Sequence, residues 1–438
     1  MQRFSVSALR SQLYGRGALT VSLFARLGFG LIMFIVLARL LPAEDFGFVA
    51  FAVSLGTLWG ASTDWGQSFD ILRRIVKRPS STAIVVERAF YSKIILSLAS
   101  YPLIFSLSFL PTLSGHLGLA QLIYLSCFFS GLSEILVSVL RARGRYFDEC
   151  LIAVASGVAG IACPLAAAFI WVSPIEVSWG LFFGRLLALI MVFSFMWKAI
   201  VPSRWSTSHF RGIGLMIRKN AALAADGILV TFYNQVDSFI TGSLLSGINF
   251  ANYQAGSRFM QAISPLASML AVSNLPKTTN ALRDKSISFI FIITMVMVEF
   301  AFVGFVAGMM FYFLGPYLNI WLFKNKFVFL NGLWGGFAAA TMVRFCAGGA
   351  AVILMAYHRE RYLIVPRALS ITVLITGGVI FIPLFGIHSV PYLLWISGVT
   401  LMVGNMIALT HTGHGKILIW IVSAVSLVLS FLFLVAPR

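Results

Sequence analysis

The sequence has few charged residues, and acidic residues are especially scarce. Only 11% of the 438 residues are charged, with 14 Asp and Glu against 32 Lys and Arg. An apolar content of 59% and a mean hydropathy of +0.94 exceed what the surface of a water-soluble domain tolerates. The composition therefore indicates an integral membrane protein. A net charge of +18 would suggest nucleic-acid binding in a soluble chain, but here it must first be compared with membrane topology, and we expect no nucleic-acid partner.

Features that would indicate catalysis or metal binding are also rare. The four cysteines lie in or beside apolar segments without CxxC spacing, which predicts neither a disulfide framework nor a metal site. Six histidines fall at predicted span ends, and the HxxH formed by His411 and His414 has no acidic partner nearby. No GxxxxGK[ST] motif and no long hydrophilic domain is present, which excludes an ATP-driven pump within one chain. We expect no enzyme activity, catalytic residue, metal or cofactor.

Thirteen apolar stretches are long enough to cross about 30 Å of hydrocarbon as helices. They run approximately 17–41, 46–65, 84–110, 117–140, 150–172, 177–199, 220–245, 250–275, 286–314, 328–356, 362–385, 388–411 and 417–435. A helix satisfies its own backbone hydrogen bonds at every depth of the bilayer. The predicted fold class is an all-α polytopic membrane protein with 12–14 spans and a best count of 13.

A basic, polar link divides these helices into two sets of six. We expect an N-lobe at 1–199, a cytoplasmic linker at 200–219, a C-lobe at 220–411 and an extra C-terminal span at 412–438. Because six is even, both halves begin on the same side, which suits a parallel pseudo-two-fold repeat around a central cavity. LLPAEDFG from Leu40 and LLSGINFA from Leu244 share Leu, Leu and Phe at an offset of 204.

Basic residues are distributed unequally between the two predicted sides. One side holds 24 of the 32 Lys and Arg residues, with Arg88 and Lys93 among them, and the other side holds four. Positive residues near span ends are retained in the cytoplasm. This asymmetry predicts a multi-pass protein whose N-terminus is cytoplasmic, and the excess charge also favours anionic lipid headgroups.

Ionisable residues within the spans are the main functional candidates, because each costs at least about 2.5 kcal/mol to insert. They are Arg26, Arg185, Arg258 and Arg344, with the acids Glu134, Asp226, Asp237 and Glu299. Guanidinium groups are planar, permanently charged forks suited to phosphate recognition. The alternative is that each arginine pairs with one of the acids and holds helices together.

Two neighbouring predicted helices carry polar stripes. Asp226, Tyr233 and Asp237 follow each other at spacings of seven and four residues, close to whole helical turns. The next helix has Gln254, Arg258 and Gln261 at spacings of four and three. Such stripes must turn away from lipid, so we expect them to line an aqueous cavity between the halves. A packed polar seam is the alternative.

Two blocks of sequence resemble one transporter family. LARLLPAEDFGFVAFAVSL followed by STDWGQSFDILRRIVKR, and YNQVDSFITGSLLSGINFANYQAGSRF, are similar to the polysaccharide transporters. These are the lipid-linked oligosaccharide flippases of the multidrug/oligosaccharidyl-lipid/polysaccharide superfamily. The matching positions include the run from Gly66 to Arg73, the pair Tyr253 and Arg258, and Pro276 where the family often ends its eighth helix. Ala251 departs from the family's usual glycine, and a thirteenth span exceeds its common twelve.

The resemblance implies a two-lobed bundle that passes an undecaprenyl-pyrophosphate-linked glycan to the periplasmic leaflet of the bacterial inner membrane by alternating access. The glycan would serve O-antigen (lipopolysaccharide) or exopolysaccharide assembly. Membrane lipid, a polysaccharide polymerase and a chain-length regulator are the expected partners. The expected contacts of the pyrophosphate and glycan are Arg26, Arg185, Arg258, Arg344, Tyr253, Gln254 and Gln261. The expected coupling or gating residues, working with H⁺ or Na⁺, are Asp237, Asp226, Glu134 and Glu299.

Three other functions fit parts of the sequence. A drug or metabolite antiporter of the same superfamily would favour cationic substrates through acids, whereas four arginines against four acids suggest an anion. A membrane-embedded glycan polymerase or ligase would need a long outer loop with Arg and His, and the longest predicted here is 315–327. A lipid scramblase would not need the acids at 226 and 237. The sequence leaves the identity of the glycan and of the coupling ion open.

Overall fold

The computed structural model describes residues 21–22, 25, 28–110, 112–113, 115–200, 212–245, 247–284, 288–357, 359–410 and 416–435. In these ranges the chain forms helices joined by short turns and contains no β-strand. The all-α fold class is therefore confirmed. The chain divides into two compact units, Met1–Thr231 and Phe232–Arg438. The division falls inside the long helix α8 (Ile213–Leu244).

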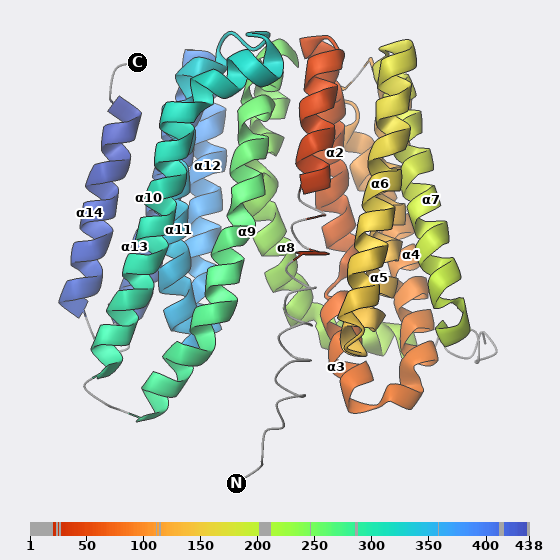
Figure 1. Cartoon of the computed structure of the whole chain (residues 1–438), viewed down its shortest axis with the longest axis horizontal. Helices are drawn as coiled ribbons and strands as arrows, with labels where there is room; N and C mark the ends of the chain where they lie inside the picture. Colours follow the sequence, from red (N-terminus) through yellow and green to blue (C-terminus); the bar gives the residue numbers. More distant parts are fainter. Residues whose placement is uncertain are drawn as a thin grey trace. The chain divides into compact units, whose positions relative to one another are not determined.

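The N-terminal unit is a bundle of long helices with one short helix, α3, near its lower end in Figure 1. Its elements are the helical segment Gly28–Leu40, α2 (Ala43–Asp64), α3 (Gln67–Lys77), η1 (Pro79–Ser81), α4 (Thr82–Leu107), α5 (Leu117–Ala142), α6 (Tyr146–Trp171), α7 (Pro174–Ile200) and the first part of α8. The central helix is α5, which contacts α2, α3, α4, α6 and α7. Its Ile135 and Leu136 pack with Ile71 and Ile75 of α3 in one core cluster.

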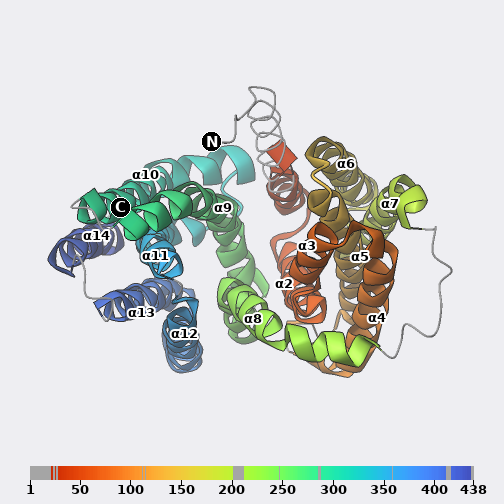
Figure 2. The same ribbon diagram turned by 90° about the horizontal axis from the view of Figure 1, so that it is seen from below.

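The C-terminal unit is a second helical bundle, built around α11. Its elements are the end of α8, α9 (Gly247–Asp284), α10 (Ser288–Phe323), α11 (Leu330–Ala356), η3 (Glu360–Leu363), α12 (Ile364–Phe385), η4 (Gly386–Ser389), α13 (Val390–Thr410) and α14 (Lys416–Val435). In the end-on view of Figure 2, α11 lies among α9, α10 and α13, and it also contacts α14. In the most apolar stretch of α11, 83% of the residues are buried, against 33% in α10.

Small residues make the central position of α11 possible. A Cβ atom on Gly336 would lie 2.0 Å from Cβ of Pro391, at the start of α13. Any larger residue would push the two helices apart. Because lipid tails are as apolar as the side chains, helix association in a membrane depends on such close van der Waals packing.

The predicted spans agree with the helices. Each of the twelve stretches from 46–65 to 417–435 coincides with one long helix, and the first is helical where it is described, at Gly28–Leu40. Among the described residues, eight helical segments are long and apolar enough to cross a membrane by length and composition. The helices α8 and α9, which carry the polar stripes, are not among them.

Three boundaries differ from the sequence expectations. The basic segment after α2 forms a separate helix, α3, because Trp65 and Gly66 turn the chain with φ of 47° and 69°. The helix α8 begins at Ile213, so the end of the predicted linker forms its first turns. The expectation that Pro276 ends its helix is wrong, since α9 continues to Asp284. A proline removes only one hydrogen-bond donor, and a packed membrane helix tolerates that loss.

Equivalent helices in the two units begin at a constant sequence offset. The helices α2 and α9 begin at Ala43 and Gly247, the same 204-residue offset that relates Leu40 to Leu244. The most connected helices, α5 and α11, are the fourth long helix of their respective halves. Each unit therefore uses the same order of long helices to build its core.

Candidate functional site

A short hydrogen bond joins α8 to α9 inside the C-terminal unit. The hydroxyl of Tyr253 donates to Oδ2 of Asp237 at 2.6 Å, and Oδ1 of Asp237 accepts from the backbone N–H of Ser238 at 2.8 Å. Tyr253 is 0% exposed and Asp237 is 1% exposed. A buried carboxylate is costly unless its oxygens are hydrogen-bonded, and here both oxygens are.

Arg344 extends this group of residues to α11. Its guanidinium carbon lies 5.2 Å from the centroid of the Tyr233 ring, and its Nη1 lies 3.9 Å from Sδ of Met260. Its Nε and Nη2 atoms are buried and have no hydrogen-bond partner among the described residues. Cation–π stacking stabilises the charge without using these N–H groups. Arg344 therefore keeps donors that an anion can accept from.

The polar stripe of α9 lies beside these residues. Nη1 of Arg258 donates to Oε1 of Gln261 at 3.0 Å, and Oε1 of the fully buried Gln254 accepts from Oγ of Ser257 at 3.2 Å. Both guanidiniums interact electrostatically with Tyr253 and Asp237. We call the group formed by the following residues the C-terminal polar cluster: Tyr233, Asp237, Tyr253, Gln254, Arg258, Gln261 and Arg344.

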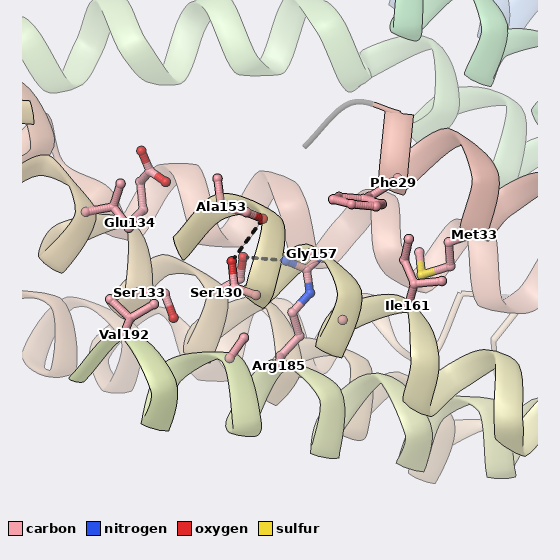
Figure 3. A pocket seen from close by; sticks show the side chains of 15 residues that line it. Phe29, Met33, Ser130, Ser133, Glu134, Ala153, Gly157, Ile161, Arg185 and Val192 are labelled. Carbon is pink, nitrogen blue, oxygen red and sulfur yellow. Dashed lines mark hydrogen bonds between the residues drawn. The ribbon is translucent and has the colours of Figure 1, made fainter. Parts of the chain in front are cut away.

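The N-terminal unit contains a cavity of about 230 Å³. It is lined by the helical segment Gly28–Leu40 and by α5, α6 and α7. Figure 3 shows Arg185 directed toward Ser130, with Glu134 at one end of the cavity and Phe29 at the other. Nη1 of Arg185 donates to Oγ of Ser130 at 3.0 Å, while Glu134 pairs with Arg141 at 3.4 Å. The cavity thus contains an arginine that donates a hydrogen bond to a neutral hydroxyl.

Among the remaining predicted site residues, the structure describes the side chain of Glu299, which belongs to neither group. Glu299 of α10 accepts a hydrogen bond of 2.8 Å from Nδ2 of the buried Asn274 on α9. This contact joins two helices and gives Glu299 a structural partner. Arg26 and the side chain of Asp226 lie outside the described residues.

A comparison with protein-family models identifies the chain. The model described as polysaccharide biosynthesis protein matches residues 36–313, which is more than half of the sequence. The chain belongs to this family. The resemblance noted in the two sequence blocks is thereby confirmed, and both blocks lie inside the matched region.

Solved structures show the same fold at low sequence identity. The lipid II flippase MurJ in an inward closed conformation is 15% identical, with a TM-score of 0.71 over 96% of this chain and 93% of that one. An inward-facing multidrug resistance MATE family transporter of the MOP superfamily is 12% identical, with a TM-score of 0.63 over 91% and 94%. The eukaryotic MATE transporter AtDTX14 is 15% identical, with a TM-score of 0.58 over 97% and 98%. No curated protein gives a significant sequence match.

Lys93 is a buried cation that the charge pattern assigned to a cytoplasmic span end. It is 0% exposed inside α4, and its Nζ donates to the carbonyl of Gly60 at 3.1 Å and to Oγ1 of Thr63 at 3.3 Å. Its burial was not predicted, because a long lysine side chain can turn into the bundle when a backbone carbonyl and a hydroxyl accept its hydrogen bonds. The predicted span 84–110 contains Lys93, and a lysine inside a span is the sequence signal that could have indicated its burial.

Proposed function

We propose that the protein is a flippase for undecaprenyl-pyrophosphate-linked oligosaccharide repeat units. It would move them from the cytoplasmic to the periplasmic leaflet of the bacterial inner membrane by alternating access, for O-antigen or exopolysaccharide assembly. Membership of the polysaccharide biosynthesis family supports this proposal. So does a fold shared with a protein described as a lipid II flippase.

The observation that carries the proposal is the state of Arg344. Two of its guanidinium nitrogens are buried without a hydrogen-bond partner among the described residues, on a helix that forms the centre of its unit. Buried donors without a partner cost free energy, so their retention suggests a ligand that binds them in another state of the transport cycle. A diphosphate has the charge and the paired acceptor oxygens that a guanidinium fork binds best.

The other groups receive supporting roles. Arg258, Tyr253, Gln254 and Gln261 would contact the diphosphate and the first sugars from α9, and Arg185 would provide a second cationic contact in the N-terminal cavity. Asp237 would act in coupling to H⁺ or Na⁺, or in gating, through its bond to Tyr253. Glu134 and Glu299, already engaged with Arg141 and Asn274, are weaker candidates for coupling. A polysaccharide polymerase and a chain-length regulator would act on the translocated product.

A direct test uses the purified full-length protein in liposomes. The substrate is a polyprenyl-diphosphate-linked trisaccharide with a fluorescent sugar, and an impermeant reductant reports the fraction in the outer leaflet over time. We expect translocation of this lipid and none of the same trisaccharide on an uncharged polyprenol. Arg344→Gln should reduce the rate about ten-fold or more, and Arg344→Lys should restore only part of it, because an ammonium lacks the bidentate fork.

The exposed Arg143, at the end of α5, supplies the matched control. Arg143→Gln removes one positive charge outside the two groups and should leave the rate unchanged. Equal rates for the charged and uncharged lipids would overturn the proposal. Gradient-driven uptake of a cationic dye with no movement of the glycolipid would instead support the antiporter. Membrane orientation is tested separately with a Cys introduced at Ser206. We expect this Cys to be labelled from the cytoplasmic side only.

A further inference from the structure

The N-terminal unit has a second cavity, of about 240 Å³, that is separate from the one containing Arg185. It lies between α3 and the first turns of α8. Its lining consists entirely of charged and amide side chains, namely Asp70, Arg73, Arg74, Lys77, Lys219 and Asn220. None of these residues belongs to the groups assigned to translocation.

The position of this cavity follows from how α3 is held. Ile71 and Ile75 are each 1% exposed and pack in the core cluster around α5, so the opposite face of α3 carries its charges outward. The indole Nε1 of Trp65 donates to the carbonyl of Ile217 at 3.0 Å, which fastens the turn before α3 to the beginning of α8. This bond therefore holds the two basic segments near each other.

The charges in the cavity are not balanced by the protein. Asp70 is the one acid in the lining, and its Oδ1 accepts from Nε of Arg74 at 2.8 Å. In the part of the chain that the structure describes, Arg73, Lys77 and Lys219 have no acidic partner within ion-pairing distance. Three positive charges beside one neutralised pair create a positive potential that attracts an anion.

Asn220 provides an independent indication of a ligand. It is 3% exposed and lines the cavity, and its Nδ2 is buried without a hydrogen-bond partner among the described residues. Buried amide donors are nearly always satisfied in folded proteins, so an unsatisfied one beside a basic cavity indicates a missing acceptor. A phosphate oxygen would accept from this amide while the surrounding cations neutralise its charge.

We propose that this cavity binds the phosphate of an anionic phospholipid headgroup. A lipid is favoured over a free anion because apolar residues next to the site remain uncovered: Val76 on α3 is 63% exposed and Leu215 on α8 is 58% exposed. An amphipathic helix with basic and apolar exposed residues at the end of a helical bundle lies where headgroups meet acyl chains. This lipid holds α3 against α8, independently of whether the protein translocates a glycolipid.

The test measures lipid binding to the purified full-length protein in detergent by native mass spectrometry. The probes are phosphatidylglycerol, zwitterionic phosphatidylcholine and inorganic phosphate. We expect one tightly bound phosphatidylglycerol, and weaker binding of the other two probes. Lys77→Gln/Lys219→Gln should raise its dissociation constant about ten-fold or more, since each basic residue near a lipid surface contributes measurably to anionic binding.

Two further variants distinguish lipid binding at this cavity from nonspecific electrostatic attraction to the protein and from misfolding. Arg143→Gln/Lys277→Gln also removes two exposed positive charges, but outside the cavity, and should change the dissociation constant less than two-fold. Lys77→Arg/Lys219→Arg keeps both charges and should retain binding. Equal weakening in the two glutamine variants would overturn the proposal. If inorganic phosphate binds as tightly as phosphatidylglycerol, the ligand is not specifically a lipid and the proposal fails. If phosphatidylcholine binds as tightly as phosphatidylglycerol, the cavity does not select an anionic headgroup and the proposal also fails.

Discussion

A Cβ atom on Gly131 would lie 2.5 Å from Cε of Lys93 and 2.6 Å from its Nζ. Glycine at this point of α5 therefore leaves room for the buried lysine of α4. The same lysine bonds to Gly60 and Thr63 of α2, so one side chain connects three helices of the N-terminal unit. Such a contact between helices replaces part of the hydrogen bonding that the ammonium loses when it leaves water.

The first prediction is that Gly131→Ala destabilises the protein by displacing Lys93. Overpacking a well-packed core costs typically about 1–3 kcal/mol, so thermal unfolding in detergent should shift clearly to lower temperature. Gly160→Ala is the control, because a Cβ there meets nothing within 4 Å. Lys93→Ala should make Gly131→Ala nearly harmless, and strictly additive effects of the two changes would contradict the clash.

The second prediction concerns the hydroxyl groups of two tyrosines in the C-terminal polar cluster. Tyr253→Phe removes the donor to Asp237 and leaves a buried carboxylate oxygen unsatisfied, which costs about 1–3 kcal/mol of stability. Tyr233→Phe should cost less than Tyr253→Phe. Among the described residues, the Tyr233 hydroxyl has only a polar interaction with the already stacked Arg344, and the ring still stacks on that guanidinium after the change.

Thermal unfolding of both variants in the same detergent tests this difference. The two changes remove one oxygen each from neighbouring sites, so side-chain size does not distinguish them. Similar losses in the two proteins would show that the bond to Asp237 is not what makes Tyr253 important.

Much of the fold could be predicted from apolar segment length alone. Twelve of the thirteen spans matched a full helix because lipid allows few alternatives to a hydrogen-bonded helix of about 20 residues. The helix α3 was not predicted because it has only 11 residues, and it alternates buried Ile71 and Ile75 with charges over a span too short to cross the bilayer. A test for membrane spans does not register such a segment.

The candidate site could be predicted as a set of residues but not as a set of contacts. Helical spacing placed Tyr233 with Asp237, and Gln254 with Arg258, on common faces. It could not show that Asp237 bonds to Tyr253, because the partner is chosen by how α8 packs on α9. Nor could it show that Arg344 stacks on Tyr233, since that contact depends on a third helix, α11.

The third prediction contrasts an ion pair that has a buried carboxylate with a more exposed pair. Nη2 of Arg141 lies 2.6 Å from Oε1 of Glu149, whose side chain is 1% exposed. Arg141→Met would remove this cation from the buried carboxylate, which should cost about 1–3 kcal/mol. Arg145 bonds to Asp148 at 2.5 Å with half of its side chain exposed, so Arg145→Met should cost less than about 1 kcal/mol.

Denaturation of the two methionine variants provides the measurement. High salt should reduce the contribution of the Arg145 pair further and affect the Arg141 pair less, because the Glu149 carboxylate is shielded from solvent. Glu134 shares Arg141 at 3.4 Å, so Glu134→Gln should be tolerated while Glu149 keeps its partner. A small loss in Arg141→Met would mean that water or another protein group stabilises the Glu149 carboxylate.

The last prediction assigns the energy coupling to Asp237. A chain without a nucleotide site needs a coupled ion for transport against a gradient, and a buried carboxylate is the simplest carrier of a proton or a ligand for Na⁺. Asp237→Asn retains an oxygen that can accept from Tyr253, but it can neither release a proton nor carry charge. In the liposome assay, wild-type transport should accelerate several-fold when a proton or sodium gradient is imposed, whereas the Asp237→Asn protein should transport at the same rate with or without the gradient.

Glu299→Gln is the control, because it also removes a carboxylate from a predicted span. Glu299 accepts a hydrogen bond from Asn274, and its replacement should leave the acceleration by the gradient intact. If the Asp237→Asn protein still responds to the gradient and Glu299→Gln does not, the coupling ion is carried on α10 and Asp237 serves only to position Tyr253.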